Sequence, residues 1–145
     1  MILRKANIDD KMYLFNWVNK FDSLSVKIEN EKEISLFDHE NWFYERLKDK
    51  NTYIWIIENK KNTPIGQIRF QKKKSNYYDV DIYILSEERK KGLATEALIE
   101  AIKVSKFPPL RAIIRKNNFS SYHFFSKNGF TLTSEDQFKW ILIKE

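Results

Sequence analysis

The sequence predicts a mixed α/β fold, and three observations lead to that prediction. Several short segments alternate apolar with polar residues, which is typical of strands buried on one face. Other segments, above all the one after Gly92, repeat apolar residues at helical spacing. The chain of 145 residues is 42% hydrophobic and 15% aromatic, so it has enough bulky side chains to close a core. We therefore expect one domain over residues 1–145, with about six or seven strands flanked by about four helices.

Two helices are expected in the first third of the chain. Asp9 or Asp10 can cap the first helix, and Ser35 can cap the second, at residues 36–48. Segment 21–34 between them is polar and has no clear period, which predicts irregular structure. The side of the first helix expected to be buried carries Met12, Phe15 and Val18.

Strands dominate the rest of the chain, with two further helices between them. One helix begins after Gly92 and ends before Pro108 and Pro109. A shorter one begins at Ser120 or Ser121 and can end in a left-handed cap at Gly129. The expected strands are residues 2–4, 52–58, 65–71, 77–85, 110–115, 130–133 and 138–144.

Composition and charge exclude several classes of protein. The chain has no cysteine, which excludes disulfides, thiolate metal sites and a cysteine nucleophile. No apolar run is long enough to span a bilayer, and Asp9 and Asp10 stand where a signal peptide needs apolar residues. We therefore expect a cytoplasmic protein without a metal or a membrane partner. The net charge of +6 suits nucleic acid or a phosphorylated small ligand, but the aromatic residues sit mostly at core positions, so a nucleic-acid partner is not expected.

The junction between strand 77–85 and the following helix suggests a phosphate site. The strand ends, a basic turn Arg89-Lys90-Lys91-Gly92 follows, and a helix begins at once. The first turn of a helix exposes unpaired N–H groups and a partial positive charge, and a glycine there lets a ligand approach the backbone. Alone, this short motif is better explained as an ordinary strand-to-helix turn with a solvated basic edge.

A second block of residues favours the phosphate site over an ordinary turn. Residues 118–130 contain Asn118 and Ser121 at the spacing N-x-x-S, then Phe125, Lys127 and Gly129-Phe130. Together with Arg89-Lys90-Lys91-Gly92-Leu93-Ala94 and the opening Ile2-Leu3-Arg4-Lys5-Ala6, this block resembles the GNAT superfamily of acetyl-CoA-dependent N-acetyltransferases, over the whole chain.

This resemblance implies a GNAT fold, acetyl-CoA as cosubstrate and a role for each matching residue. Backbone amides from Arg89 or Lys90 onward would hold the pyrophosphate of CoA, and the strand end would pair with its pantetheine arm. Asn118 would bind the pantetheine or phosphate region, Ser121 would cap its helix, and Phe125 and Lys127 would lie near the thiol and the nucleotide. The implied cosubstrate residues are Ile82, Tyr83, Ile84, Arg89, Lys90, Lys91, Gly92, Leu93, Ala94, Thr95, Asn118, Ser121, Phe125 and Lys127.

A finer resemblance concerns the acceptor. The pieces His39-Glu40-Asn41-Trp42-Phe43 and Gly66-Gln67-Ile68-Arg69-Phe70 are similar to GNAT enzymes of the pseudaminic-acid type, which acetylate an amino group of a nucleotide-linked sugar. Ser25-Val26-Lys27 departs from the Val-Arg pair frequent in that subgroup. His39, Trp42 and Arg69 are the expected acceptor-binding residues, although Arg69 can equally pair with Asp79 or Asp81 across the sheet.

The reaction needs a base, an oxyanion donor and, optionally, an acid. The candidate bases are His39, Asp79 and Asp81, and the candidate acid is Tyr122, because Phe125 stands where many GNAT enzymes carry a tyrosine. A backbone N–H near Tyr83 or Ile84 is the expected oxyanion donor. Without cysteine, we expect direct transfer in a ternary complex.

Three alternatives remain open at this point. The acceptor can be a protein N-terminus or another small amine, the chain can be a silent acyl-CoA-binding domain, or it can bind nucleic acid. A homodimer is compatible with the sequence.

Overall fold

The computed structural model describes residues 1–28, 32–106 and 109–145. Within these residues the strands form one seven-stranded sheet in the order β1-β2-β3-β4-β5-β7-β6. The strands are β1 (Ile2–Lys5), β2 (Thr52–Glu58), β3 (Pro64–Gln71), β4 (Tyr78–Ile84), β5 (Leu110–Arg115), β6 (Thr131–Glu135) and β7 (Lys139–Lys144). All neighbours pair antiparallel except β4 and β5, which are parallel. The mixed sheet confirms the predicted fold class.

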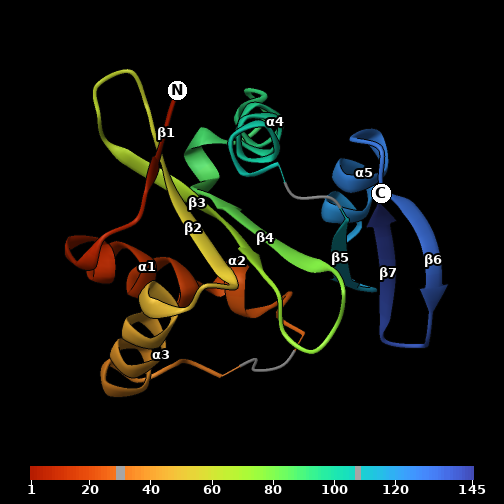
Figure 1. Ribbon diagram of the computed structural model, residues 1–145, viewed down its shortest axis with the longest axis horizontal. Coiled ribbons are helices and arrows are strands. Elements are labelled where there is room, and N and C mark those ends of the chain that lie inside the picture. Colours follow the sequence, from red (N-terminus) through yellow and green to blue (C-terminus); the bar gives the residue numbers. More distant parts are fainter. Residues whose placement is uncertain (29–31, 107–108) are drawn as a thin grey trace.

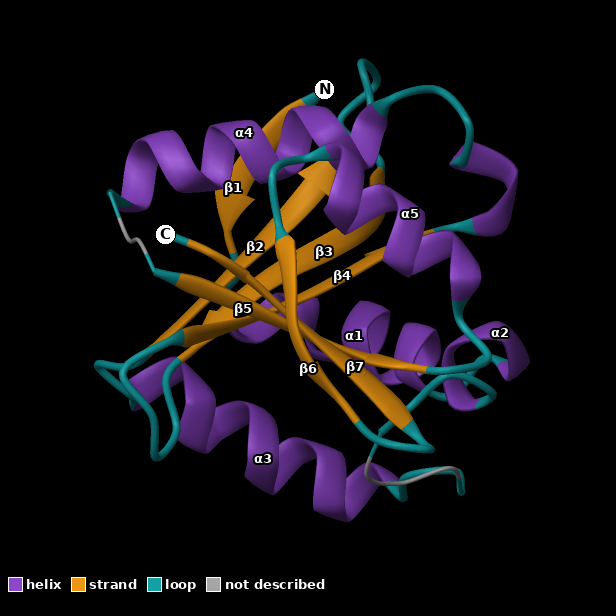
Figure 2. Ribbon diagram, turned by 90° about the vertical axis from the view of Figure 1, so that its right-hand side faces the viewer, coloured by secondary structure: helices purple, strands orange, loops and turns teal. Residues whose placement is uncertain are grey.

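Helices cover both faces of the sheet (Figure 1; Figure 2). They are α1 (Lys11–Val18), α2 (Phe21–Leu24), α3 (Leu36–Lys48), α4 (Leu93–Ser105) and α5 (Phe119–Lys127). On one face, α4 and α5 pack on a cluster that includes Leu98, Phe125 and Trp55. On the other, α1 and α3 pack on Ile54 and Ile56 of the same strand. The alternation of side chains along β2 therefore supplies both halves of the core.

The start of the first helix differs from the sequence prediction. Neither Asp9 nor Asp10 caps it with a side chain; instead Asn7 caps a short 3-10 turn, Ile8–Asp10, that leads into α1. The buried face of α1 is formed by Leu14 and Trp17, whereas Met12 is exposed. The 3-10 turn precedes the α-helix and changes which side chains face the sheet.

Three other boundaries were predicted with mixed success. Segment 21–34, expected to be irregular, contains the four-residue helix α2, and residues 29–31 lie outside the described part. Ser35 caps α3 as predicted. Helix α4 ends at Ser105, before Pro109; Pro108 lies outside the described residues.

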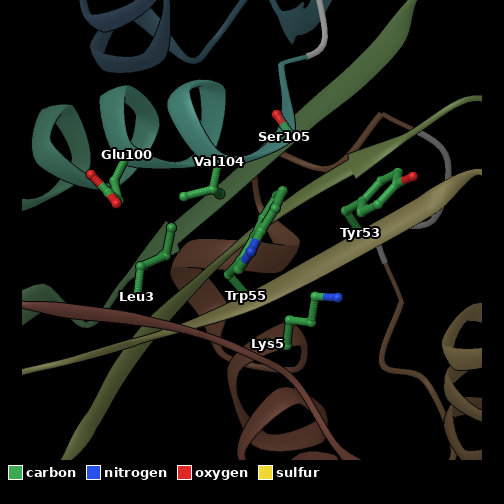
Figure 3. Close-up of a pocket in the computed structure, with 7 residues that line it drawn as sticks. All are labelled: Leu3, Lys5, Tyr53, Trp55, Glu100, Val104 and Ser105. Carbon is green, nitrogen blue, oxygen red and sulfur yellow. The ribbon is translucent and has the colours of Figure 1, made fainter.

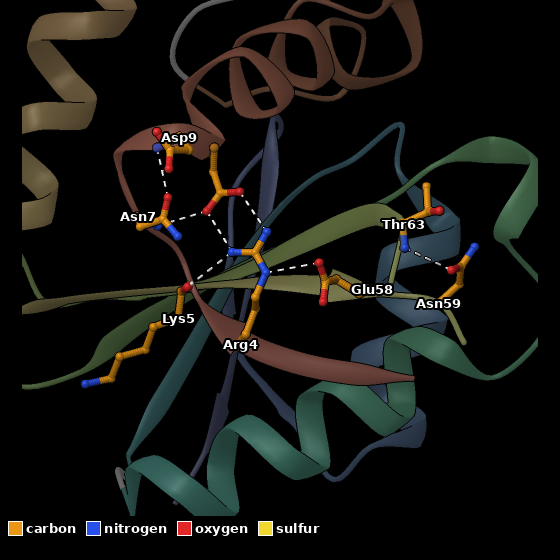
Figure 4. Close-up of polar contacts among 8 residues, drawn as sticks. Arg4, Lys5, Asn7, Asp9, Glu58, Asn59 and Thr63 are labelled. Carbon is orange, nitrogen blue, oxygen red and sulfur yellow. Dashed lines mark hydrogen bonds and ion pairs between the residues drawn. The ribbon is translucent and has the colours of Figure 1, made fainter. Parts of the chain in front are cut away.

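Asp10 has a different role, as the centre of a buried ion pair with Arg4, between β1 and the 3-10 turn. Figure 4 shows Arg4 with its other partner, Glu58. The side chain of Asp10 is 3% exposed and accepts two hydrogen bonds from Arg4, at 2.8 and 2.9 Å. The N–H of Asn7 donates to the same carboxylate at 2.8 Å, and Arg4 also binds Glu58 on β2. Burial alone would raise the pKa of Asp10, but these donors outweigh burial and lower it.

Gly66 lets β3 and β4 approach closely where β4 ends. A Cβ at this position would lie 2.2 Å from the carbonyl oxygen of Tyr83 and 3.1 Å from Ile84 Cα. Both are backbone atoms, so a side chain at residue 66 can be accommodated only if the end of β4 moves.

The Asp10→Asn substitution should lower the free energy of unfolding by about 2 kcal/mol at pH 7, because it leaves a partly buried guanidinium with a weaker partner. Since folding lowers the pKa of Asp10, its contribution is complete above the ordinary value of 3.8 and is lost as the pH falls through the folded value. Urea unfolding at pH 7 and below pH 3 measures both effects. Asp9→Asn, at an exposed neighbour, is the control; a stability difference that does not shrink in acid would contradict the prediction.

Gly66→Ala should destabilise the fold by about 1–3 kcal/mol, the usual cost of forcing an extra group into a packed site. Because the clash is with the end of β4, amide hydrogen exchange should also accelerate at Tyr83 and Leu85, whose N–H groups face β3, more than at Ile54 to Ile57. An unchanged melting temperature would show that the strands can part without cost.

Candidate functional site

The centre of the candidate site is the place where β4 and β5 part. The two strands pair only at Tyr78 with Leu110 and at Asp79 with Arg111. Beyond those pairs β4 continues to Ile84 and β5 to Arg115, and the two strands diverge (Figure 1). The last pair is reinforced by Arg111, which binds the Asp79 carboxylate at 2.6 and 3.1 Å.

The backbone of β4 has unpaired groups along this opening. The N–H of Leu85 donates to Ile65 of the strand on the other side, and such groups alternate along an antiparallel pair. The N–H and C=O groups of Ile82 and Ile84 therefore face the side of β5, where the ladder has ended. By the same alternation Tyr83 faces β3, so of the two predicted oxyanion donors Ile84 has the suitable direction.

The loop after β4 adds a second set of unpaired amides. Ser86–Glu88 form a 3-10 turn, Lys90 and Gly92 have positive φ of 62° and 78°, and α4 follows. The first amide of α4 with an acceptor is that of Glu96, which donates to Gly92. Within the described residues no protein atom accepts from the N–H groups of Lys90, Lys91, Gly92, Leu93, Ala94 and Thr95.

This loop fits the diphosphate of CoA that the family resemblance implies. Nothing lies within 4 Å of the point where a Cβ at Gly92 would be, so the loop surface is open. The unpaired amides and the helix dipole both favour an anion there. Lys90 and Lys91 are exposed beside them, and Lys91 binds Glu88 at 3.0 Å.

Arg89 is engaged elsewhere. Its N–H donates to Ser86, its Nε donates to the carbonyl of Ile84 at 2.8 Å, and its guanidinium binds Asp22 at 2.6 Å. Tyr83 donates to the same carboxylate at 3.2 Å, and burial, together with Asp22, raises its pKa to about 12. Arg89 therefore ties α2 to the end of β4, and the unpaired amides begin at Lys90. Asp22, which the sequence did not single out, completes this link.

The two predicted carboxylate bases have different surroundings. Asp79 is held by Arg111 in the two-bond ion pair described above. Asp81 is 56% exposed and accepts one hydrogen bond, from Gln67 at 2.8 Å. Arg69 lies opposite Asp81 in the register at 4.0 Å, which is the cross-strand pairing that the sequence left open. Of the two carboxylates, Asp81 is the accessible one.

The side chain of His39 lies inside the aromatic core. It is 3% exposed, with Phe15, Trp42 and Phe43 within 6.1 Å between ring centres. Burial lowers its pKa, so the ring is neutral at pH 7, and its Nε2 has no hydrogen-bond partner among the described residues. This placement favours packing behind the acceptor side over proton transfer. Trp42, in contrast, is partly exposed and lies under the guanidinium of Arg69, 4.9 Å from the ring centre.

Tyr122 packs over β7. Its ring lies 4.6 Å from that of Trp140, and β5 separates β7 from β4 in the sheet. This position disfavours Tyr122 as the acid at the opening. Phe125 is buried against Phe130 at 4.9 Å, in the core next to α4.

The predicted helix cap in this block is wrong. Asn118, and not Ser121, caps α5, because its Oδ1 accepts the N–H of Ser121 at 3.2 Å. The helix accordingly begins at Phe119, before Ser120 and Ser121. Asn118 lies just after the end of β5, and its Oδ1 is the atom that caps the helix. Lys127 is exposed in the last turn of α5.

A separate hollow of about 300 Å³ lies between β1, β2 and the second half of α4 (Figure 3). None of its lining residues belongs to the β4 end or to the loop before α4. It is lined by Leu3, Lys5, Tyr53, Trp55, Glu100, Val104 and Ser105. The hollow is therefore not part of the candidate site. The described residues contain no cluster of three metal-binding side chains, and none of their helices is long and apolar enough to cross a membrane.

Solved structures with the same fold span nearly the whole chain. A domain from Methanocaldococcus jannaschii superposes with a TM-score of 0.83 at 19% identity, covering 99% of this chain and 96% of that one. A ribosomal-protein-alanine N-acetyltransferase from Brucella melitensis gives 0.80 at 19%, with 99% of both chains covered. A spermidine N-acetyltransferase from Vibrio cholerae, in complex with CoA and spermine, gives 0.79 at 16%, covering 98% and 92%. Curated proteins give no match by sequence.

The solved structures show the fold, and a family model shows the family. The model described as an acetyltransferase (GNAT) domain matches residues 1–131, which include the parted strands and both blocks found in the sequence. The chain therefore belongs to the GNAT family of acetyltransferases.

Proposed function

We propose that this protein transfers the acetyl group of acetyl-CoA to a primary amine of a nucleotide-linked amino sugar, directly and in a ternary complex. The proposal includes a cytoplasmic location and a small-molecule acceptor, with no nucleic-acid, membrane or metal partner. Family membership supports acetyl transfer. The acceptor rests on the similarity of segments 39–43 and 66–70 to the pseudaminic-acid-type enzymes and on the positive charge of the chain.

The observation that carries the proposal is the set of unpaired amides from Lys90 to Thr95. In a folded protein nearly all backbone N–H groups have partners, and a run of exposed ones beside Gly92 matches the negative charge of a diphosphate. The backbone groups of Ile82 and the N–H of Ile84 face the same opening, which suits a pantetheine arm lying along β4 as an added strand; the carbonyl of Ile84 already accepts from Arg89.

The chemistry then needs few side chains. The amine nitrogen attacks the thioester carbonyl carbon, the carbon–sulfur bond breaks, and the sulfur leaves with the electron pair. The N–H of Ile84 is suited to bind the oxygen that becomes negative. Without cysteine, the transfer proceeds with no thiol intermediate. Neither Tyr122 nor Phe125 offers an acid at the opening, so the thiolate leaves unassisted or takes its proton from water.

Asp81 is the proposed base. An ammonium group has no lone pair for attack, so it must lose a proton, either to the carboxylate or to water held by it. Asp81 lies on the same strand as Ile84 and is largely exposed, whereas Asp79 is occupied by Arg111.

Gly92→Asp should weaken acetyl-CoA binding at least about tenfold relative to Gly92→Asn. Asparagine and aspartate tolerate the left-handed conformation similarly, so the pair differs mainly by a negative charge placed at the proposed diphosphate site. Calorimetric titration with acetyl-CoA measures the difference, and equal melting temperatures show that both variants fold. Equal affinities of the two variants would contradict the proposal that the diphosphate binds at this loop.

Asp81→Asn should lower kcat by about 10²-fold or more, because the amine loses its proton acceptor, and raising the pH should recover part of the rate as free amine becomes abundant. Asp79→Asn is the matched control: it removes the ion pair with Arg111 and should lower the melting temperature, with kcat nearly unchanged. Release of CoA in the presence of UDP-linked amino sugars provides the assay. Equal kcat values for wild type and Asp81→Asn would exclude Asp81 as the base.

A further inference from the structure

Lys27 lies near Asp81 and Arg69, and hydrogen bonds to the backbone of its segment hold it in place. Arg115 at the end of β5 donates to the carbonyl oxygens of Ser25 and Lys27 at 3.5 and 3.4 Å. Asn117 donates to Ser25 at 2.9 Å. Because Asp22, in the same segment, is bound by Arg89, segment 22–27 is fastened both to the end of β4 and to the end of β5.

The ammonium group of Lys27 is half-buried and has no hydrogen bond or ion pair among the described residues. Burial lowers its pKa; the nearby carboxylate of Asp81 acts against that shift, and the guanidinium of Arg69 adds to it. The charge of Lys27 therefore interacts with Asp81 and Arg69, the two side chains that face each other between β3 and β4.

Arg69 is only weakly committed to Asp81. The two lie 4.0 Å apart, whereas Gln67 makes a 2.8 Å hydrogen bond to the same carboxylate. The guanidinium lies over the ring of Trp42, 4.9 Å from its centre, and its N–H groups have no acceptor at hydrogen-bond distance among the described residues. A guanidinium with free N–H groups is suited to bind a carboxylate or a phosphate through two parallel bonds.

Among the residues that the structure describes, the charges around Lys27 do not balance. Lys27 and Arg69 carry two positive charges against the one negative charge of Asp81, and the nearby His39 is neutral because burial lowers its pKa. A partly buried cation without a partner is costly, and the cost is recovered when an anion binds. One carboxylate close to two cations complements a ligand that carries an amine and an anionic group a few ångströms apart.

We propose that Lys27 and Arg69 bind an anionic group of the acceptor, a phosphate or a carboxylate, while Asp81 receives its ammonium group. The inference rests on the proposed acetyl transfer and narrows its substrates to amines that carry an anion nearby. Diphosphate-linked amino sugars and amino acids both meet this condition. Polyamines do not, because they would bring only positive charge to Lys27 and Arg69.

The first test measures binding without turnover. Inorganic phosphate and UDP are titrated into the CoA-saturated protein, and the same is done with Lys27→Met and with Lys48→Met. Both variants lose one lysine, but Lys48 is exposed at the end of α3, away from the site. Lys27→Met should bind at least one of the two probes roughly tenfold more weakly, the loss expected for one charge-assisted hydrogen bond, with Lys48→Met unchanged. Equal affinities in the two variants would overturn the subsite.

The second test separates the subsite from the proposed function. CoA release is measured with a UDP-linked 4-amino sugar, with α-amino acids, with their uncharged amides and with spermidine. Wild type should prefer the anionic acceptors, and Lys27→Met should lose that preference by raising KM for them while the amides react as before. Arg69→Lys should lose less than Arg69→Met, since it keeps the charge.

The possible outcomes are distinct. No acetylation of any amine would contradict the proposed function, and the phosphate and UDP titrations would still decide the subsite. Acetylation with no effect of Lys27→Met on acceptor preference, or a preference for spermidine, would overturn the subsite and leave acetyl transfer standing. A preference for the UDP-linked sugar over amino acids identifies phosphate as the bound group, and the reverse identifies carboxylate.

Discussion

The parting of β4 from β5 is the constraint on which the rest of the site depends. A parallel pair normally continues as long as both strands do, because each unpaired buried N–H or C=O group costs free energy. Here pairing stops after Asp79 and Arg111, although both strands continue. The edge of β4 that remains is aligned with the amide-rich start of α4. One continuous line of backbone donors and acceptors results, suited to a long, phosphate-bearing ligand.

Several contacts prevent the opening from closing. Strand β5 uses its other edge fully, pairing with β7 at every residue from Leu110 to Arg115. The carbonyl of Ile84 accepts from Arg89, and segment 22–27 is tied to both strand ends through Asp22 and Ser25. If the strands moved together, these side-chain bonds would have to break. The opening is thus a built feature of the fold, and the same segment that holds it also brings Lys27 to the site.

The sequence predicted the helices and strands whose bounds are determined by neighbouring residues. Residues 36–48, 52–58 and 110–115 have the predicted bounds, because a capping serine and the β-branched runs define them without help from distant residues. The buried face of α1 was predicted only in part: Leu14 and Trp17 are its buried residues, whereas Phe15 and Val18 are partly buried and Met12 is exposed. The same distinction holds at the site. Asp22 and Lys27 acquire their roles through Arg89, Tyr83, Arg115 and Asp81, which lie far along the chain, and segment 21–34 showed no period that could reveal them.

The two halves of the site differ in how they achieve recognition, which explains why only one of them was visible in the sequence. The cosubstrate half uses backbone amides, and what it needs from the sequence is a turn that can present them, with Gly92 at positive φ. A short contiguous motif records that requirement. The acceptor half, as proposed, uses side chains from the segment after α2, from α3 and from β3 and β4, and its specificity would depend on how many charges of each sign meet there. Because one substitution at Lys27, Arg69 or Asp81 changes that balance without disturbing the amides, the proposed acceptor specificity can change while the fold and its CoA loop stay the same. If the proposed subsite is right, these three charges, and not the family motif, carry the information on the acceptor.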